Sequence, residues 1–218
     1  PAIEPAAGRV DAPAVPSDFM IDVALRLDAL TAIMLAMVTC ISLVVAIYSV
    51  GYMHADRGYW RFFAYIGLFV FSMTMLVSVS NFLLLFVFWE AVGLCSYLLI
   101  GFWYEKPSAA AAGMKAFLVN RVGDFGFMLG VFLIWTTYGT LNYHDTPLAT
   151  PAAVVGDRSP DVAAVPDAGS LPGILGTYRT TVLGHVGGAT GLAICLLLLL
   201  GACGKSAQFP LHVWLPDA

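Results

Sequence analysis

The chain has 218 residues, of which 60% are hydrophobic and only 11% are charged, and its formal net charge is −4. An ordinary soluble domain carries about 25% charged residues, so this composition excludes a large soluble core and indicates an integral membrane protein. The negative net charge gives no support for nucleic-acid binding. The four cysteines all lie inside apolar runs without C-x-x-C spacing, a pattern that fits neither a metal cluster nor a disulfide framework.

The first predicted membrane span covers residues 29–51, where "ALTAIMLAMVTCISLVVAIYSVG" contains no charge. A helix needs about 20 apolar residues to cross the bilayer core, and this run is long enough. Asp28 precedes it, at a helix N-terminus, where negative charge is favoured. Neither a signal peptide nor an initiating methionine is visible, and we expect the chain to be a fragment cut at both ends.

The next apolar stretch predicts two spans, at 61–79 and 82–104. It contains one charge, Glu90, and is too long for a single crossing. Asn81, which follows two serines, is the expected tight turn between the two spans. Aromatic residues at the outer ends of the pair are typical of membrane–water interfaces; they are Tyr59, Trp60, Trp103 and Tyr104.

A fourth span is predicted at 109–136, and a fifth at 183–204. Between them, residues 137–182 are rich in proline and alanine, which predicts an extramembrane loop rather than a long helix. Pro210 ends or breaks the fifth span, and we expect a half-helix from residue 211. The fold class is therefore all-α integral membrane, with about five transmembrane helices and the last one discontinuous near Gly204–Pro210.

The short loops predict the orientation of the chain in the membrane. Cytoplasmic loops carry an excess of lysine and arginine, and short loops count most. Residues 51–61 and 104–115 hold four such residues, whereas the turn at Asn81 on the opposite side holds none. We therefore place 51–61 and 104–115 on the cytoplasmic side of a multi-pass protein of the bacterial inner membrane.

Four ionisable residues fall well inside the apolar spans: Glu90, Arg121, Asp124 and Lys205. Each such charge costs about 2.5–3.5 kcal/mol at a helix centre on insertion scales, so by default these residues face the protein interior and mark an ion or proton path. Arg121 and Asp124 are three positions apart and share a helix face, which is compatible with a structural ion pair. Glu90 has no opposite charge within a turn of its own helix, so its partner must come from another helix.

Lys205 lies in "GACGKSAQFP", whose GKS letters suggest a nucleotide phosphate loop. That motif requires a glycine at position 199, which is Leu199, and the preceding "CLLLLL" is typical of a membrane helix. A lysine that reaches the interface from the end of a span is the plain alternative. The glycines and Pro210 instead favour a discontinuous helix whose freed backbone groups need polar partners or water, with Lys205 as a functional residue. Lys115 in the fourth span and His212 after the break are supporting candidates.

Two segments of the chain carry a family resemblance: "WEAVGLCSYLLIGFW" and "GKSAQFPLHVWLPDA". As a pair they resemble the antiporter-like membrane subunits of respiratory complex I (NADH:quinone oxidoreductase, subunit L type), which are related to the large subunits of Mrp antiporters. The resemblance covers roughly residues 18–140 and 183–218. It implies an inverted-repeat fold of which this chain holds part, and it leaves residues 145–180 unmatched.

The resemblance implies that Glu90 pairs with Lys205 and that both take part in proton translocation, with Arg121 and Asp124 near the same channel. A carboxylate that approaches a buried lysine favours its ammonium form, so movement of Glu90 would control proton uptake and release. No cofactor is expected in this chain; NADH, flavin, iron–sulfur clusters and quinone are expected in partner subunits. The implied partners are the other membrane subunits of complex I and the lipid bilayer.

Two other functions fit the same sequence. The first is the large subunit of a Mrp-type sodium/proton antiporter or a related ion-coupled complex. The second is a non-catalytic membrane scaffold whose charges only pair with one another. Four charges around a broken helix argue against the scaffold.

Overall fold

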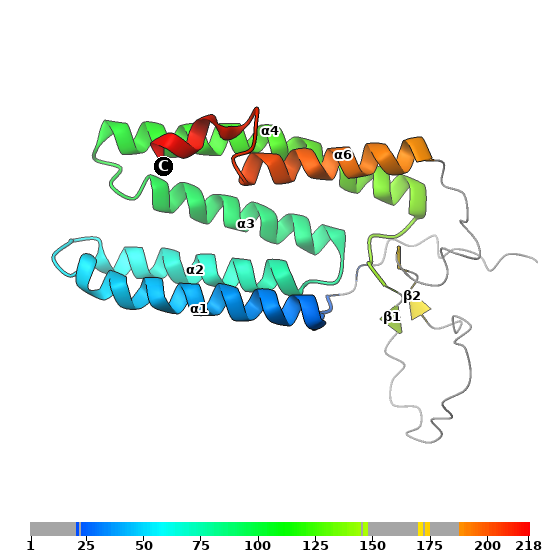
Figure 1. Ribbon diagram of the computed structural model, residues 1–218, viewed down its shortest axis with the longest axis horizontal. Coiled ribbons are helices and arrows are strands. Elements are labelled where there is room, and N and C mark those ends of the chain that lie inside the picture. Colours follow the sequence, from blue (N-terminus) through cyan, green and yellow to red (C-terminus); the bar gives the residue numbers. More distant parts are fainter. Residues whose placement is uncertain (1–20, 22, 145, 148–169, 172, 175–187) are drawn as a thin grey trace, which may run out of the picture.

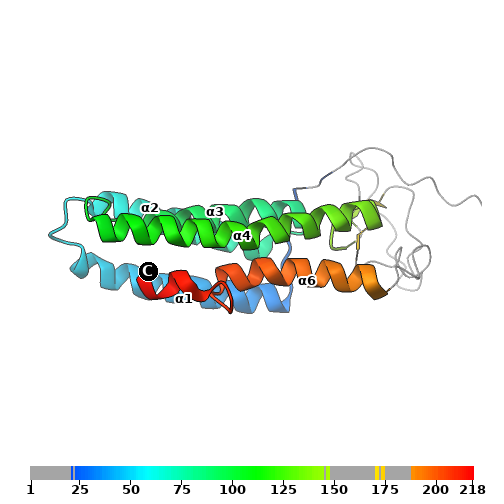
Figure 2. The same cartoon turned by 90° about the horizontal axis from the view of Figure 1, so that it is seen from above.

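The computed structural model describes residues 21, 23–144, 146–147, 170–171, 173–174 and 188–218. Most of the predicted loop 137–182, and residues 183–187 of the predicted fifth span, lie outside these residues. The helices run side by side along one long axis (Figures 1 and 2). They are α1 (Ala29–Tyr52), α2 (Tyr59–Ser78), α3 (Phe82–Ile100), α4 (Pro107–Tyr138) and α6 (Gly188–Lys205), followed by the 3₁₀ helix η1 (His212–Asp217).

The all-α class is confirmed, since the described strands amount to one small pair. The strands β1 (Thr146–Pro147) and β2 (Ser170–Leu171) have two residues each and pair antiparallel. They lie beyond the end of the helical bundle (Figure 1). They do not contribute to the part of the molecule that holds the intramembrane charges.

Local signals in the sequence set the helix ends. The Asp28 carboxylate accepts a hydrogen bond from the Thr31 N–H at 2.7 Å, and the Asn81 side chain accepts one from the Leu84 N–H at 2.8 Å. Both are N-caps, which satisfy backbone donors that a helix start leaves free. Gly139 ends α4 in the left-handed region, with φ of 67°, which glycine adopts without strain.

The helices pack in a chain of neighbours. α1 contacts α2, α2 contacts α3, α3 contacts α4, and α4 contacts both α6 and η1. Seen from above, α1 and α6 lie in one layer and α2, α3 and α4 in the other (Figure 2). α4 thus occupies the position from which its side chains reach α3 on one side and α6 on the other.

The helices α1, α2, α3 and α4 are long and apolar enough to cross a membrane. Large apolar side chains of α1 face outward, with Leu30 70% and Ile33 67% exposed, as expected for contact with lipid. The 32 residues of α4 span about 48 Å, longer than the roughly 30 Å hydrocarbon core. The chain is therefore a multi-pass membrane protein.

The predicted helix break is present. α6 ends at Lys205, partway along α4, and the chain continues beside α4 to the C-terminal residue as η1 (Figure 1). Ala207 adopts a positive φ of 49° within the turn. The Trp214 indole donates a hydrogen bond to the carbonyl oxygen of Gly204 at 3.1 Å, which satisfies one of the acceptors that the end of α6 leaves free.

Candidate functional site

The four intramembrane charges meet at the middle of the bundle. Glu90 comes from α3, Arg121 and Asp124 from α4, and Lys205 from the last position of α6. The side chains of Asp124 and Lys205 are only 4% and 14% exposed, and that of Glu90 is 23% exposed. Three helices therefore bring two acids and two bases together where the surrounding side chains are apolar.

Arg121 is the partner of Glu90. Its Nη1 donates to Glu90 Oε2, and the same nitrogen lies 3.9 Å from Asp124 Oδ2. The guanidinium also lies over the Phe117 ring, 4.6 Å from its centroid. The predicted pair between Arg121 and Asp124 is thus the longer of two contacts, because Glu90 on the neighbouring helix approaches Arg121 more closely.

Lys205 is held by a backbone carbonyl and one carboxylate. Its ammonium donates to the Trp89 carbonyl oxygen at 2.7 Å and lies 3.9 Å from Asp124 Oδ1. The pairing of Glu90 with Lys205 that the family resemblance implied is not the one in this structure: across the described residues, Lys205 has no ion pair with Glu90 within 4.0 Å. Arg121 pairs with Glu90 Oε2 instead.

Trp89 connects the two halves of the cluster and was not among the predicted site residues. Its indole N–H donates to Asp124 Oδ1 at 2.7 Å, while its carbonyl oxygen accepts from Lys205. The ring stacks on Phe127 of α4, with centroids 5.0 Å apart. Its position next to Glu90 in the sequence was the available signal, but an aromatic residue in an apolar run carries no mark of a polar role.

Gly93 provides the space for Lys205. In an α-helix the Trp89 carbonyl accepts the N–H of residue 93, one turn later, so the lysine approaches this carbonyl past position 93. A Cβ atom on Gly93 would overlap Lys205 Nζ. The absence of a side chain at this position therefore opens the backbone of α3 to the ammonium group.

Three buried acceptor oxygens in this region have no hydrogen-bond partner within the described part of the chain. They are Glu90 Oε1, Asp124 Oδ2 and Asn120 Oδ1. Asn120 is 6% exposed and lies one turn before Asp124 on α4, and it too was not among the predicted residues. Buried acceptors that protein groups leave unpaired are the groups that internal water binds.

Lys115 and His212 lie outside this charge cluster. Lys115 forms an ion pair with Asp217 at 2.6 Å, with both side chains nearly half exposed, and so ties α4 to the end of η1. The His212 ring stacks on Phe209, with centroids 5.9 Å apart. His212 thus lies just after the helix break and Lys115 at the far end of η1, and neither forms an ion pair with a cluster residue in the described part of the chain.

Metal binding finds no support in the residues that the structure describes, since no three His, Cys, Asp or Glu side chains gather there. The four cysteines are free. Cys95 is buried, with its sulfur 4.0 Å from the Ser72 hydroxyl.

Comparisons with known proteins match most of the chain. Residues 79–218 match the family model described as NADH:quinone oxidoreductase/Mrp antiporter, TM. Residues 14–63 match the model described as NADH-Ubiquinone oxidoreductase (complex I), chain 5 N-terminus.

Individual proteins with similar sequences carry names that agree with these two family models. NADH-quinone oxidoreductase subunit L of Neisseria meningitidis serogroup A is 48% identical over 193 residues, which are 88% of this chain and 25% of that protein. The subunit L of Rickettsia bellii is 46% identical over 202 residues, 93% of this chain and 28% of that protein. NAD(P)H-quinone oxidoreductase subunit 5 of the Paulinella chromatophora chromatophore is 46% identical over 201 residues, 92% of this chain and 26% of that protein. The chain spans about a quarter of the length of these curated relatives.

Proposed function

The chain belongs to the NADH:quinone oxidoreductase/Mrp antiporter family of membrane proteins, and we propose that its complete protein translocates protons as a subunit of NADH:quinone oxidoreductase. The family resemblance drawn from the sequence is thereby confirmed. On this proposal the chain is the membrane part of a translocase of the bacterial inner membrane. NADH, flavin, iron–sulfur clusters and quinone are handled by partner subunits, and the other membrane subunits of that complex surround this one.

One observation carries the proposal: two acids and two bases from three helices meet beside a helix break at membrane depth. A charge buried in a membrane is costly unless it is paired, so four of them in one place require compensation or a function. Two of these residues each have two possible ion-pair partners: Arg121 lies near two carboxylates, and Asp124 lies near two cations. A group with two candidate partners can exchange one for the other.

The proposed mechanism is such an exchange of partners. With Arg121 on Glu90, Lys205 has Asp124 and the Trp89 carbonyl as its neighbours. If Arg121 shifts toward Asp124, the Glu90 carboxylate is released toward Lys205 and favours its ammonium form, so a proton is taken up. The return of Arg121 to Glu90 removes that stabilisation and favours release of the proton.

The unpaired oxygens support a hydrated route to the cluster. Glu90 Oε1, Asp124 Oδ2 and Asn120 Oδ1 are buried acceptors without a hydrogen-bond partner in the described residues, and α6 ends at Lys205 beside them. Irregular backbone within a membrane is tolerated where it lines a polar cavity. In the proposal, water bound at these groups carries protons to and from Lys205, and quinone reduction in partner subunits drives the exchange.

The variant Glu90→Ala in the complete subunit tests this proposal. Removal of this carboxylate leaves Arg121 without its close partner and Lys205 without the group that controls it, so NADH-driven proton pumping in membrane vesicles is expected to fall while the complex still assembles. Asp157→Ala, which removes a carboxylate outside the predicted spans, is the control and should pump normally. Equal pumping by the two variants would refute the role of Glu90.

A second function, a Mrp-type sodium/proton antiporter, is supported by the family description, which names both classes. The relatives named NADH-quinone oxidoreductase subunit L favour the first function. Sodium-dependent transport in vesicles that receive no NADH would favour the antiporter. Transport that depends on NADH and not on sodium would favour the oxidoreductase.

A further inference from the structure

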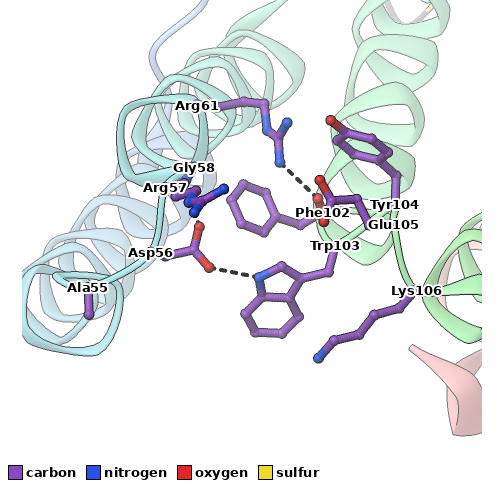
Figure 3. Close-up of a pocket in the computed structure, with 10 residues that line it drawn as sticks. All are labelled: Ala55, Asp56, Arg57, Gly58, Arg61, Phe102, Trp103, Tyr104, Glu105 and Lys106. Atoms are coloured by element: carbon purple, nitrogen blue, oxygen red, sulfur yellow. Dashed lines mark hydrogen bonds between the residues drawn. The ribbon is translucent and has the colours of Figure 1, made fainter.

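A second polar site lies at one end of the bundle, away from the charge cluster. It is a cavity of about 430 Å³ between the loop that joins α1 to α2 and the loop that joins α3 to α4 (Figure 3). Positively charged, acidic and aromatic side chains line it together; the ten lining residues are Ala55, Asp56, Arg57, Gly58, Arg61, Phe102, Trp103, Tyr104, Glu105 and Lys106.

The positive charges of the cavity are not neutralised by ion pairs. Three cations, Arg57, Arg61 and Lys106, face two acids, and within the described residues none of the three cations lies within 4.0 Å of a carboxylate oxygen. Arg61 donates to the Phe102 carbonyl at 3.0 Å, and its Nε is buried without a hydrogen-bond partner in the described part of the chain. An arginine with an unused donor is suited to bind an anion.

The hydrogen bonds of Asp56 come from neutral donors, while Arg61 and Lys106 act on its carboxylate only through their charge. Its Oδ2 accepts from the Trp103 indole at 2.8 Å (Figure 3). Its Oδ1 accepts from the Gly58 N–H at 2.6 Å. The hydrogen bond from Trp103 first, and then the one from Gly58, hold the pKa of Asp56 below its ordinary value, so the carboxylate is ionised at neutral pH. The hydrogen bond from Trp103 to Asp56 also joins the two loops that form the cavity. The three cations remain without a carboxylate oxygen within 4.0 Å in the described residues and can bind an anion.

Aromatic rings orient the cations and place the cavity at the membrane surface. The Arg61 guanidinium lies over the rings of Phe102 and Tyr104, at 4.7 Å and 5.0 Å, and Lys106 Nζ lies 4.8 Å above Trp103. Tyr104 is 61% exposed and the nearby Trp60 is 83% exposed. Exposed tyrosine and tryptophan at the ends of membrane helices mark the level of the lipid headgroups.

We propose that this cavity binds the phosphate of an anionic phospholipid headgroup. Unpaired arginine and lysine side chains bind phosphate oxygens, and basic pockets between membrane helices on the cytoplasmic side bind anionic headgroups. The location favours a lipid over free phosphate, because one wall of the cavity is the loop between α1 and α2, two helices whose exposed apolar side chains can receive the acyl chains. The side is the one predicted to be cytoplasmic, where anionic lipids are enriched.

The test uses the complete subunit in its complex, extracted in mild detergent and incubated with phosphatidylglycerol or phosphatidylcholine before native mass spectrometry. Arg57→Gln with Lys106→Gln is expected to weaken phosphatidylglycerol binding about 30-fold, since each basic residue near an anionic surface contributes a factor of about five. Two controls accompany it. Arg57→Lys with Lys106→Arg keeps the charges and should retain the lipid, and Arg158→Gln with Arg179→Gln removes the same net charge elsewhere and should also retain it.

Each outcome decides the proposal. Selective retention of phosphatidylglycerol, lost in the first double variant alone, supports it. Equal binding by all variants, or binding of phosphatidylcholine as strong as that of phosphatidylglycerol, overturns it. Full displacement of the lipid by millimolar inorganic phosphate would assign the cavity to a free anion instead. Because no proton pumping is measured, failure here leaves the proposed function untouched.

Discussion

Glu90 and Lys205 are the two residues on which proton transfer depends in the proposed function, yet in this structure each has another partner. Arg121 takes the Glu90 carboxylate, and Lys205 donates to the Trp89 carbonyl near Asp124. A buried ion pair is weak support for stability, because desolvation of the charges offsets their attraction. A cluster in which pairs can be exchanged is therefore better explained by a switch than by a structural brace.

The position of the Lys205 ammonium can be tested without a change of charge. Gly93→Ala adds a Cβ atom that would overlap Lys205 Nζ, so the ammonium must shift from its place beside the Trp89 carbonyl. Slower NADH-driven proton pumping is expected, although every charge remains. Gly67→Ala is the matched control, because nothing lies within 4 Å of its added Cβ. If both variants pump alike, the contact between Lys205 and Trp89 has no role in proton transfer.

At the residue scale the sequence predicted which charges lie inside the membrane but not how they pair. A charge in an apolar run is visible at once, and the cost of burying it makes it a site candidate. The partner of Glu90 depends on how α3 and α4 pack, which is a long-range property. The sequence did not predict Trp89 or Asn120 as site residues. Trp89 acts through its backbone carbonyl and its indole N–H, and Asn120 through a buried side-chain amide. All of these groups also occur in helices that hold no site.

At the scale of elements, the site depends on the close approach of α4 and α6. A Cβ atom on Gly123 would lie 3.0 Å from the Leu200 carbonyl oxygen and 3.2 Å from Gly204 Cα, so the two backbones nearly touch there. Small residues permit such contact between membrane helices. This contact holds Lys205, at the end of α6, against Asp124 on α4.

Gly123→Leu is expected to separate these two helices. Insertion of a side chain into a packed contact costs about 1–3 kcal/mol, and the shift would also move Lys205 away from Asp124. The measurement is thermal unfolding of the complete subunit in detergent, together with its proton pumping. Gly191→Leu in α6, where nothing lies within 4 Å of the added Cβ, should leave stability nearly unchanged. Equal melting temperatures for the two variants would show that the α4–α6 contact accommodates a leucine side chain at position 123 without loss of stability.

The helix break is the element that the sequence predicted best. Glycines and Pro210 around Lys205 indicated a discontinuous helix, and α6 ends at Lys205. The sequence did not predict that the next segment is a 3₁₀ helix, or that Trp214 bonds back to the Gly204 carbonyl. These features depend on the neighbouring α4 rather than on the local run of residues.

At the scale of the whole molecule, the described helices form one elongated bundle (Figure 1). Its intramembrane charges lie on α3, α4 and the end of α6, and a basic, aromatic cavity lies between the two short loops at one end. The two short loops that hold the basic residues lie at the same end, as the distribution of lysine and arginine predicted. Apolar length and charge placement predict this plan because a bilayer permits few alternatives. The loop 137–182 carries no comparable constraint, and the family resemblance does not extend to it.

Proton pumping by Lys205→Ala in the complete subunit tests most directly whether this lysine carries the proton. The complex is reconstituted in proteoliposomes, and the number of protons translocated per NADH oxidised is measured beside Arg158→Ala, a control that removes a cation outside the predicted spans. We expect an assembled Lys205→Ala complex to translocate fewer protons per NADH, while Arg158→Ala matches the wild type. A wild-type ratio in an assembled Lys205→Ala complex would contradict the assignment of Lys205 as the proton carrier.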